Sequence, residues 1–220
     1  MVVKVVGLTG CICAGKSTIT RFVSQHTVFS TADSSTVEVV VLDADKVGWE
    51  VYRQGTNCYQ KLVDYFTDAI LNSETKDIDR KILGGIVFSD NVKMLALQSI
   101  VWPEMRLSMS STIKDIRRRA SESGANVLVL LEAAVMVEAS WSDLCDIVWV
   151  VLLPRAESVS RLMKRNGLSV EDAIIRVNAQ ISDEERTKAA SRVIDGSLPE
   201  EAVEAETSRL LKEDFLDCIN

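Results

Sequence analysis

The sequence predicts an α/β fold with a five-stranded parallel β-sheet, and two observations lead to this prediction. Short, β-branched and nearly continuous apolar segments alternate with longer segments of helical periodicity, the pattern of parallel strands joined by helices. A glycine-rich loop, GCICAGKS, follows the first apolar segment directly and precedes a helical one. The chain has 220 residues, of which 47% are hydrophobic, so it can bury the core that such a fold requires.

The predicted strands and helices follow from these two periodicities. The strands are 4–8, 37–42, 126–131, 147–153 and 192–194, of which the last is the shortest. Helical patterns occupy 16–25, 59–66, 80–88, 91–100, 104–120, 156–165, 170–180 and 200–211. Because parallel strands are joined by right-handed crossovers, we expect helices on both faces of the sheet.

The spacing of the strands predicts two further parts. The stretch between 42 and 126 is far longer than a single crossover needs, so 46–123 is expected to form a helical subdomain. The remaining core then comprises 1–45, 124–155 and 188–220. Between the fourth and fifth strands a helical pair is interrupted at NGLS, which predicts a mobile hairpin within 156–187.

Composition limits the classes of partner. The formal net charge is −7, from 25 Lys and Arg against 32 Asp and Glu, so nothing attracts the whole chain to nucleic acid or an anionic membrane. The basic cluster at 117–119 is short and falls near a helix end, where cations favour the helix dipole. Apolar runs such as 147–153 are far shorter than the roughly 20 residues of a membrane helix. We therefore expect no nucleic acid and no membrane among the partners.

Cysteine usage indicates the compartment. The five cysteines are odd in number and scattered along the chain, and the chain does not open with a charged-then-apolar leader. Both features favour a reducing, intracellular environment over a disulfide-forming one. We therefore expect a cytoplasmic protein.

The glycine-rich loop carries the strongest motif of the chain. Its residues match G-x-x-x-x-G-K-[ST], and it lies between an apolar strand and an amphipathic helix, as that motif requires. The glycines let successive N–H groups turn toward the phosphates of a nucleotide, Lys16 reaches the β- and γ-phosphate oxygens, and Ser17 ligates Mg²⁺. The predicted nucleotide-binding residues of the loop are Gly10, Cys11, Ile12, Cys13, Ala14, Gly15, Lys16, Ser17 and Thr18.

The same loop contains a Cys-x-Cys pair, Cys11 and Cys13, which is the alternative basis for a metal or redox site. The remaining cysteines and the only histidine, His26, show no zinc spacing that would complete such a site. The phosphate-binding interpretation is therefore the favoured one.

A pair of acidic residues follows the second predicted strand. Asp43 and Asp45 lie in VVVLDADKVG at the carboxyl edge of the sheet, where open α/β sheets bind ligands. In an extended segment residues two apart face the same side, so both carboxylates are candidates to line the cleft; capping of a following helix is the alternative for Asp43. Phosphoryl transfer to a hydroxyl needs such a carboxylate near the acceptor proton.

A GTPase is the other interpretation of this segment, because 45–48 reads D-x-x-G. No N-K-x-D or T-K-x-D guanine motif occurs in the chain, so a kinase for a small molecule is the better prediction.

Several blocks together resemble one family. The blocks are GLTGCICAGKST, VLDADKVG, DIDRKILGGIVFSD, VWPEM, VLLEAAVMVEASW and RLMKRNGLSVEDAIIRVNAQIS. Their order and approximate spacing resemble the dephospho-CoA kinases over nearly the whole chain. The resemblance implies a P-loop NTPase three-layer fold with a helical acceptor-binding subdomain and a helical lid. It also implies transfer of phosphate from ATP to the ribose 3′-hydroxyl of dephospho-coenzyme A, the last step in making coenzyme A.

The resemblance implies roles for the matching residues. Lys16 and Ser17 match the ATP and Mg²⁺ contacts, and Asp45 matches the base for the 3′-hydroxyl. Arg161 and Arg165, one helical turn apart, match the lid that closes over ATP, and exposed helix arginines without a role are the alternative. The predicted catalytic residues are thus Lys16, Asp45 and Arg165.

Three more residues are expected on the substrate side. Arg80 matches a recurrent arginine of the acceptor site, with a surface ion pair as its alternative. Glu138 matches a recurrent glutamate whose role the resemblance leaves open. Gln180 matches a position for which a nucleotide contact and a helix-end contact are equally open.

The chain departs from the bacterial pattern at several positions. Trp102 stands where many bacterial members have the His of a His-Pro pair, 134–136 where they have Pro-Leu-Leu, and Ser191 and Gly196 where they have an Asp and an Asn. The last two departures leave the contacts around the fifth strand, and with them adenine recognition, unassigned. Trp-Pro and EAAVMVEA instead resemble the kinase half of the bifunctional coenzyme A synthases of animals. We therefore expect a eukaryotic source and consider association with a phosphopantetheine adenylyltransferase.

Two other functions stay open at this point. One is a P-loop kinase for a different hydroxyl or for a nucleoside monophosphate, against which the downstream blocks argue. The other is a nucleotide-binding regulatory protein without chemistry. Asp45 and the two lid arginines favour catalysis, because a pure binding protein has no need of them.

Overall fold

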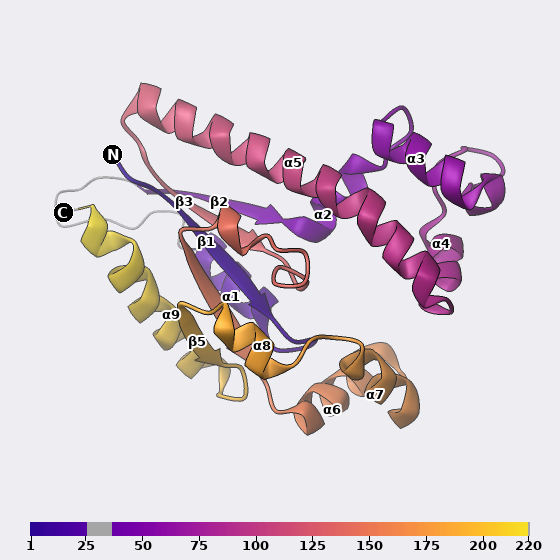
Figure 1. The fold of residues 1–220 in the computed structure, drawn as a ribbon. Coiled ribbons are helices and arrows are strands. Elements are labelled where there is room, and N and C mark those ends of the chain that lie inside the picture. The colour runs from indigo at the N-terminus through magenta and orange to yellow at the C-terminus, as the bar shows by residue number, and fades with distance from the viewer. Residues whose placement is uncertain (26–36, 220) are drawn as a thin grey trace. The chain divides into compact units, whose positions relative to one another are not determined.

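The computed structural model describes residues 1–25 and 37–219, so His26 lies outside the described residues. The chain divides into two compact units, Met1–Leu42 with Asp115–Asn220, and Asp43–Lys114 (Figure 1). The first contains the sheet and the second is helical.

The first unit is organised by a five-stranded sheet in the order β2-β3-β1-β4-β5. The strands are β1 (Val3–Gly10), β2 (Val37–Asp43), β3 (Asn126–Glu132), β4 (Ile147–Leu152) and β5 (Arg192–Asp195). The pairings of β1 with β3, β1 with β4 and β4 with β5 are parallel. The predicted fold class is confirmed, and every predicted strand is present with its ends shifted by at most two residues.

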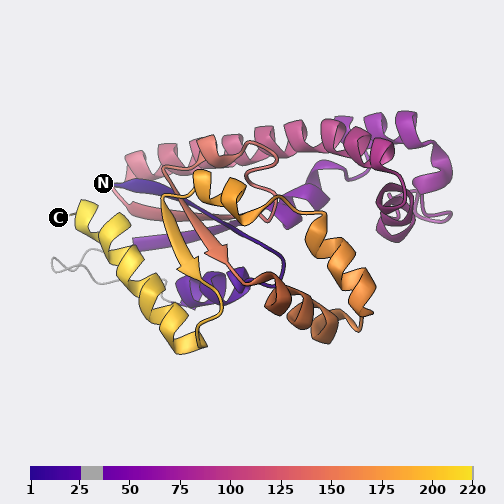
Figure 2. The same ribbon diagram turned by 60° about the horizontal axis from the view of Figure 1, so that its bottom comes forward.

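The central strands are apolar on both sides because helices cover both faces. β1 is buried from Val5 to Gly10 and β3 from Asn126 to Leu131. On one face α1 (Lys16–Gln25) packs beside α9 (Glu200–Asp214), and α8 (Asp183–Lys188) covers the opposite face (Figure 2). Two further helices, α6 (Arg155–Asn166) and α7 (Val170–Asn178), form a hairpin before α8.

The C-terminal helix is tied to the sheet by a buried polar contact. The Trp149 indole N–H donates to Asp214 Oδ2 at 2.8 Å, and Arg192 Nη2 donates to Asp214 Oδ1 at 2.6 Å. Asp214 is only 3% exposed, so both donors are needed to offset the loss of its hydration.

The second unit contains α2 (Ala44–Val51), α3 (Asn57–Phe66), α4 (Arg80–Phe88) and the first part of α5 (Asn91–Ser123). Three helices begin at capping residues. Asp43 caps α2, the Thr56 hydroxyl accepts from the Tyr59 N–H in α3, and the Asp79 carboxylate accepts from the Lys81 and Ile82 N–H groups in α4. Its apolar core includes Cys58, Leu62, Phe66, Ile70, Leu83, Val87, Met105 and Met109.

Two expectations, one of a helix break and one of an extended segment, were wrong. Helices predicted at 91–100 and 104–120 are one continuous α5 of 33 residues with Pro103 inside it. Proline removes one hydrogen bond, but a buried apolar stripe continues past it, and that burial outweighs the loss. The stripe is Val101, Met105, Met109, Ile113, Ile116 and Ala120. The extended segment predicted through Asp45 is also wrong, because β2 ends at Asp43 and α2 begins at Ala44.

Within the described residues, none of the helices is long and apolar enough to cross a membrane.

Candidate functional site

The glycine-rich loop lies between the C-terminal end of β1 and the first turn of α1, as the motif requires. Gly10 faces the Val151 carbonyl so closely that a Cβ atom there would lie 2.3 Å from the oxygen, which explains the first glycine. Gly15 has a φ of 97°, a conformation that favours glycine. Cys13 also has a positive φ of 61°, so the loop turns sharply at two points before α1 begins.

Lys16 lies within the curve of this loop. Its ammonium donates to the Gly10 carbonyl at 2.9 Å and to the Cys11 carbonyl at 3.1 Å. These contacts hold the charge near the loop and the N-terminus of α1, where phosphate oxygens bind in this motif.

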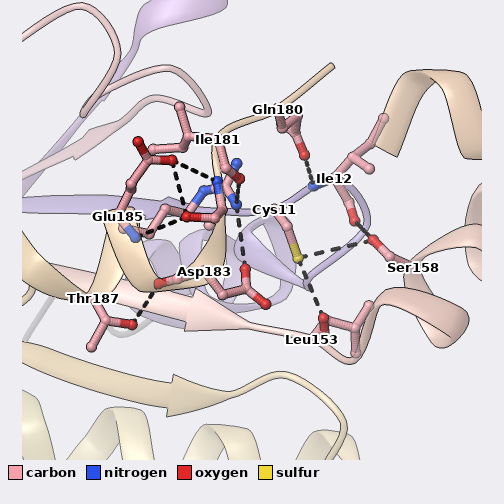
Figure 3. Close-up of polar contacts among 12 residues, drawn as sticks. Cys11, Ile12, Leu153, Ser158, Gln180, Ile181, Asp183, Glu185 and Thr187 are labelled. Carbon is pink, nitrogen blue, oxygen red and sulfur yellow. Dashed lines mark hydrogen bonds and ion pairs between the residues drawn. The ribbon is translucent and has the colours of Figure 1, made fainter. Parts of the chain in front are cut away.

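The loop is held on its other side by the segment that follows β4. Ser158 of α6 donates its hydroxyl to the Ile12 carbonyl, and Gln180 accepts the Ile12 N–H at 2.7 Å (Figure 3). Both polar groups of Ile12 are therefore bonded to side chains from the α6 to α8 segment. Gln180 thus contacts the loop backbone directly, beyond the end of α7.

Arg161 joins three parts of the site. Its guanidinium donates to the Cys13 carbonyl at 3.3 Å and to the Gly196 carbonyl at 3.0 Å, and it also pairs with Glu157. Arg165, one turn further along α6, is exposed and donates to the neighbouring Asn166 side chain at 2.9 Å. Of the two predicted lid arginines, Arg161 therefore contacts the loop, whereas Arg165 extends into solvent.

Ser191 and Gly196, the two departures around β5, have structural partners. Ser191 accepts the Val148 N–H at 3.1 Å, which fixes the start of β5 against β4. Gly196 lies against the loop, because a Cβ atom there would be 2.3 Å from the Ala14 carbonyl oxygen. Position 196 thus requires the absence of a side chain for this close approach.

One acidic residue beside the loop was missed by the sequence analysis. Glu132 ends β3, next to β1 in the sheet, and its carboxylate accepts the Thr20 hydroxyl of α1 at 2.6 Å. Ser17 lies almost one turn earlier on α1 and is exposed. The signal was available, since Glu132 is an acidic residue at the end of a buried apolar strand, and P-loop NTPases hold Mg²⁺ with a carboxylate in addition to the loop hydroxyl.

This donor set fits a magnesium ion that arrives with a nucleotide. No group of three or more His, Cys, Asp or Glu among residues 1–25 and 37–219 is arranged to hold a metal ion. A hydroxyl at Ser17 and a carboxylate at Glu132 are oxygen ligands, and Mg²⁺ typically takes one or two protein ligands together with substrate phosphates. A Cys-x-Cys metal site has no support among these residues.

Glu138 lies in the turn after β3 and pairs with Arg186 of α8, whose side chain is 2% exposed. The distance from Arg186 Nη2 to Glu138 Oε1 is 3.8 Å. Arg186 also donates to the Ile181 carbonyl at 3.0 Å. The predicted substrate-side glutamate is thus in contact with a buried arginine close to Gln180.

The helical unit holds the two acidic residues of the DAD segment. The Asp43 carboxylate accepts the N–H groups of Asp45 and Lys46, at 2.9 and 3.4 Å, and is the N-cap of α2. Asp45 lies exposed in the first turn of that helix. Gly48 is buried within α2, so the D-x-x-G segment is a helix rather than a switch loop.

A pocket in the same unit contains Arg80. The Arg80 guanidinium lies 4.3 Å from the centre of the Trp49 ring, a cation–π geometry. Tyr52 is close to Arg80 and Asp45: burial raises its pKa, Arg80 opposes that rise and Asp45 adds to it. The pocket is lined by Trp49, Tyr52, Arg53, Gln54, Asp77, Ile78 and Arg80.

Comparison with known proteins identifies the family. The family model described as dephospho-CoA kinase matches residues 4–200. The chain belongs to the dephospho-CoA kinase family.

Relatives share the family's name, and solved structures share the fold. A dephospho-CoA kinase of Bacillus licheniformis is 38% identical over 207 residues, covering 94% of each chain. The crystal structure of TT1252 from Thermus thermophilus has a TM-score of 0.70 at 28% identity and covers 97% of this chain and 98% of its own. A dephospho-CoA kinase from Campylobacter jejuni shares the fold, with a TM-score of 0.64, 24% identity, and coverage of 97% and 98%.

Membership of the dephospho-CoA kinase family confirms the resemblance that the sequence blocks indicated. The match over 4–200 includes the loop, the helical unit and the β5 region.

Proposed function

We propose that this chain transfers the γ-phosphoryl group of ATP to the ribose 3′-hydroxyl of dephospho-coenzyme A, giving coenzyme A and ADP, the final step of coenzyme A biosynthesis. The observation that carries the proposal is the family match over residues 4–200, which includes a complete phosphate loop. The chain would accordingly be a transferase, and ATP its phosphoryl donor.

The nucleotide side of the reaction uses the loop residues 10–18. Backbone N–H groups and the N-terminus of α1 attract the phosphates, while Lys16 offsets negative charge on the transferring group. Ser17 and Glu132 are the residues that would hold Mg²⁺, which supplies further charge neutralisation when bound. Preorganisation supports this role, since Arg161, Ser158 and Gln180 already fix the loop backbone.

The acceptor side uses the helical unit. Arg80 and Arg53 bring two guanidinium groups to a pocket that also holds the Trp49 and Tyr52 rings, a combination suited to a phosphate ester that carries an aromatic base. Asp45 is the proposed base: it is exposed, and as a carboxylate it can accept the proton of the 3′-hydroxyl.

We further propose that the α6–α7 hairpin is the lid. Gly167 ends α6 in a left-handed conformation with φ of 64°, and Ser169 caps α7, so two rigid helices meet at a short turn. Movement of this hairpin would bring the exposed Arg165 to the phosphates and place it among the catalytic groups. The lid then spans about 156–187, and the acceptor subdomain about 46–123.

The test is an assay of ADP release with Mg-ATP, with and without dephospho-coenzyme A, in which the product is identified by mass. We expect ADP only with that acceptor, and coenzyme A in equal amount. Lys16→Ala is the control, with turnover lower by at least about a hundredfold because it removes charge stabilisation in the transition state. ADP release with another hydroxyl or a nucleoside monophosphate would identify a different kinase. ATP binding without turnover would indicate a regulatory protein.

Finer expectations belong with this proposal. We propose a cytoplasmic location, which the five free thiols of the described chain support, since such thiols persist in reducing compartments.

We also propose kinship with the kinase half of animal bifunctional coenzyme A synthases, supported by the Trp102–Pro103 pair, and association with a phosphopantetheine adenylyltransferase. Co-elution of the two purified proteins in size-exclusion chromatography tests the association; separate elution at micromolar concentration contradicts it.

A further inference from the structure

We infer that Glu138 and Arg186 are positioning residues: their buried ion pair holds Gln180 against the phosphate loop and so sets the affinity for the nucleotide. The inference deepens the proposed function, on which it rests for the identity of the bound nucleotide. It assigns roles to a glutamate whose function the sequence left open and to an arginine that no motif identified.

The first step is the cost of burying Arg186. The residue is 1% exposed, and a buried guanidinium loses its hydration unless other groups replace it. Three partners face it: the Ile181 carbonyl at 3.0 Å, Asp183 Oδ1 at 3.4 Å and Glu138 Oε1 at 3.8 Å. Only Glu138 comes from a different part of the fold, the turn after β3.

The pair is not arranged for maximum stability. At 3.8 Å the two charges attract without a hydrogen bond, and Glu138 Oε2, Arg186 Nε and Arg186 Nη2 are buried with no protein hydrogen-bond partner. An apolar pair of the same volume would be as stable or more stable in such a place. A polar pair here is better explained by the specific geometry it imposes than by the stability it adds.

The geometry it imposes reaches Gln180. Arg186 Nη1 binds the carbonyl of Ile181, the residue next to Gln180, and the following turn is fixed by the capping box of Ser182 and Glu185 at the start of α8. Glu138 joins this rigid turn to the end of β3. The backbone of residue 180 is therefore anchored to the sheet on one side, and its side chain is directed at the loop (Figure 3).

Gln180 in turn fixes the loop at Ile12. Its Oε1 accepts the Ile12 N–H at 2.7 Å, while Ser158 binds the Ile12 carbonyl. Ile12 immediately precedes Cys13, whose positive φ starts the turn toward α1. Because Ile12 is held, the backbone that follows it has fewer conformations before phosphates bind and loses less conformational entropy when they do. Gln180 therefore raises the affinity for the nucleotide without contacting it.

The experiment measures binding of Mg-ADP by titration calorimetry, which needs no acceptor and no turnover. Glu138→Gln keeps the shape and removes the charge, and we expect it to weaken ADP binding about fivefold. Gln180→Ala is expected to weaken binding about tenfold, the effect of one lost hydrogen bond. The double variant should bind no more weakly than Gln180→Ala alone, because both substitutions act through one contact.

The matched control is Asp214→Asn, which changes another buried carboxylate of the same unit, bonded to Trp149 and to the partly exposed Arg192. It should lower Tm while leaving ADP binding unchanged. If Glu138→Gln proves unstable, Arg186→Lys keeps the charge and is expected to bind ADP less than threefold more weakly than the native chain, whereas Arg186→Met loses at least fivefold.

Three outcomes overturn the inference. The first is a double variant whose fold-loss in ADP affinity equals the product of the losses in Glu138→Gln and Gln180→Ala, because that result means independent effects. The second is native ADP affinity in Glu138→Gln, and the third is a native chain that does not bind ADP. Tight ADP binding with the expected coupling but without phosphorylation of dephospho-coenzyme A refutes the proposed function and leaves the inference standing.

Discussion

Gly196 lies so close to Ala14 that a Cβ atom at position 196 would be 2.3 Å from the Ala14 carbonyl oxygen. The same glycine donates its N–H to the Leu152 carbonyl at 2.7 Å and receives the Arg161 guanidinium on its own carbonyl. The segment after β5 is therefore in direct contact with the phosphate loop. The space between them has no room for a side chain larger than the hydrogen of glycine at position 196.

Gly196→Ala should be destabilising because backbone atoms have to move. Overpacking of this kind lowers the free energy of unfolding by about 1–3 kcal/mol, which corresponds to a fall in Tm of several degrees, and ADP affinity should fall with it. Gly85→Ala is the control: nothing lies within 4 Å of the new methyl group. Since Gly85 is inside α4, alanine there should raise the free energy of unfolding by about 0.5–1 kcal/mol. Thermal unfolding of the two variants decides, and equal Tm values would contradict the close packing at 196.

The roles of Asp45 and Asp43 can be distinguished by replacing each with asparagine. Asparagine caps a helix as well as aspartate, so Asp43→Asn should keep both stability and turnover. Asp45→Asn removes the proposed base, and kcat should fall by at least about a hundredfold while ADP binding stays unchanged. Steady-state kinetics of both variants test this, and a reversal of the two effects would assign the base to Asp43.

Arg80→Lys tests the acceptor pocket. A lysine keeps the charge but loses the planar contact 4.3 Å above the Trp49 ring and the paired donors of the guanidinium. The KM for dephospho-coenzyme A should rise about tenfold, in line with the loss of one cation–π contact and part of a charged hydrogen bond, with little change in the KM for ATP. Arg118→Lys, at an exposed ion pair on α5, is the control. Equal KM values in both variants would remove Arg80 from the acceptor site.

Two thiols should respond slowly to alkylation. Burial raises the pKa of Cys58 to about 11, with Glu104 adding to the rise, and burial raises the pKa of Cys145 to about 12, with Asp146 and Asp143 adding to it. Near pH 8.5 both remain protonated in the folded chain, whereas the exposed Cys218 is accessible. Mass spectrometry of iodoacetamide-treated protein should show Cys218 labelled first and the other two only after denaturation.

The same shifts give a pH dependence of stability. Each thiol has a higher pKa when folded, so its contribution is fully present below its ordinary value of about 9. Above that pH the unfolded chain loses the proton first, and the contribution is lost as the pH rises toward 11 and 12. Cys145→Ser should therefore flatten the fall in stability between about pH 9 and 12. The free energy of unfolding is measured by urea titration at several pH values in that range. If it falls with pH as steeply in Cys145→Ser as in the native chain, the assignment is contradicted.

The strands and α1 could be predicted because their signals are local. β-branched apolar runs and the loop motif identify them without any knowledge of distant residues. The continuity of α5 through Pro103 was not predictable in that way, since it depends on burial of residues on both sides of the proline. The start of α8 carried a local signal that was overlooked, the Ser182-x-x-Glu185 capping box.

The loop residues were predictable as a candidate site, but their supports were not. Glu138 and Arg186 are far apart in sequence and meet only because the turn after β3 and α8 are brought together by the fold. Gly196 was identified as a departure, although its close approach to Ala14 depends on distances that no spacing rule contains. Long-range contacts of this kind decide how a loop is held, whereas the motif decides only what it binds.

The stacking of Arg80 on Trp49 also gives the helical unit an optical label. Trp49 is 45% exposed and lies under a charged group in the proposed acceptor pocket, whereas Trp149 is completely buried and bonded to Asp214. Indole emission shifts with polarity, so the two rings should fluoresce at different wavelengths. Acceptor binding near Trp49 should thus change the red side of the native emission spectrum, which the partly exposed Trp102 shares, while the buried Trp141 and Trp149 supply the blue side as an internal reference.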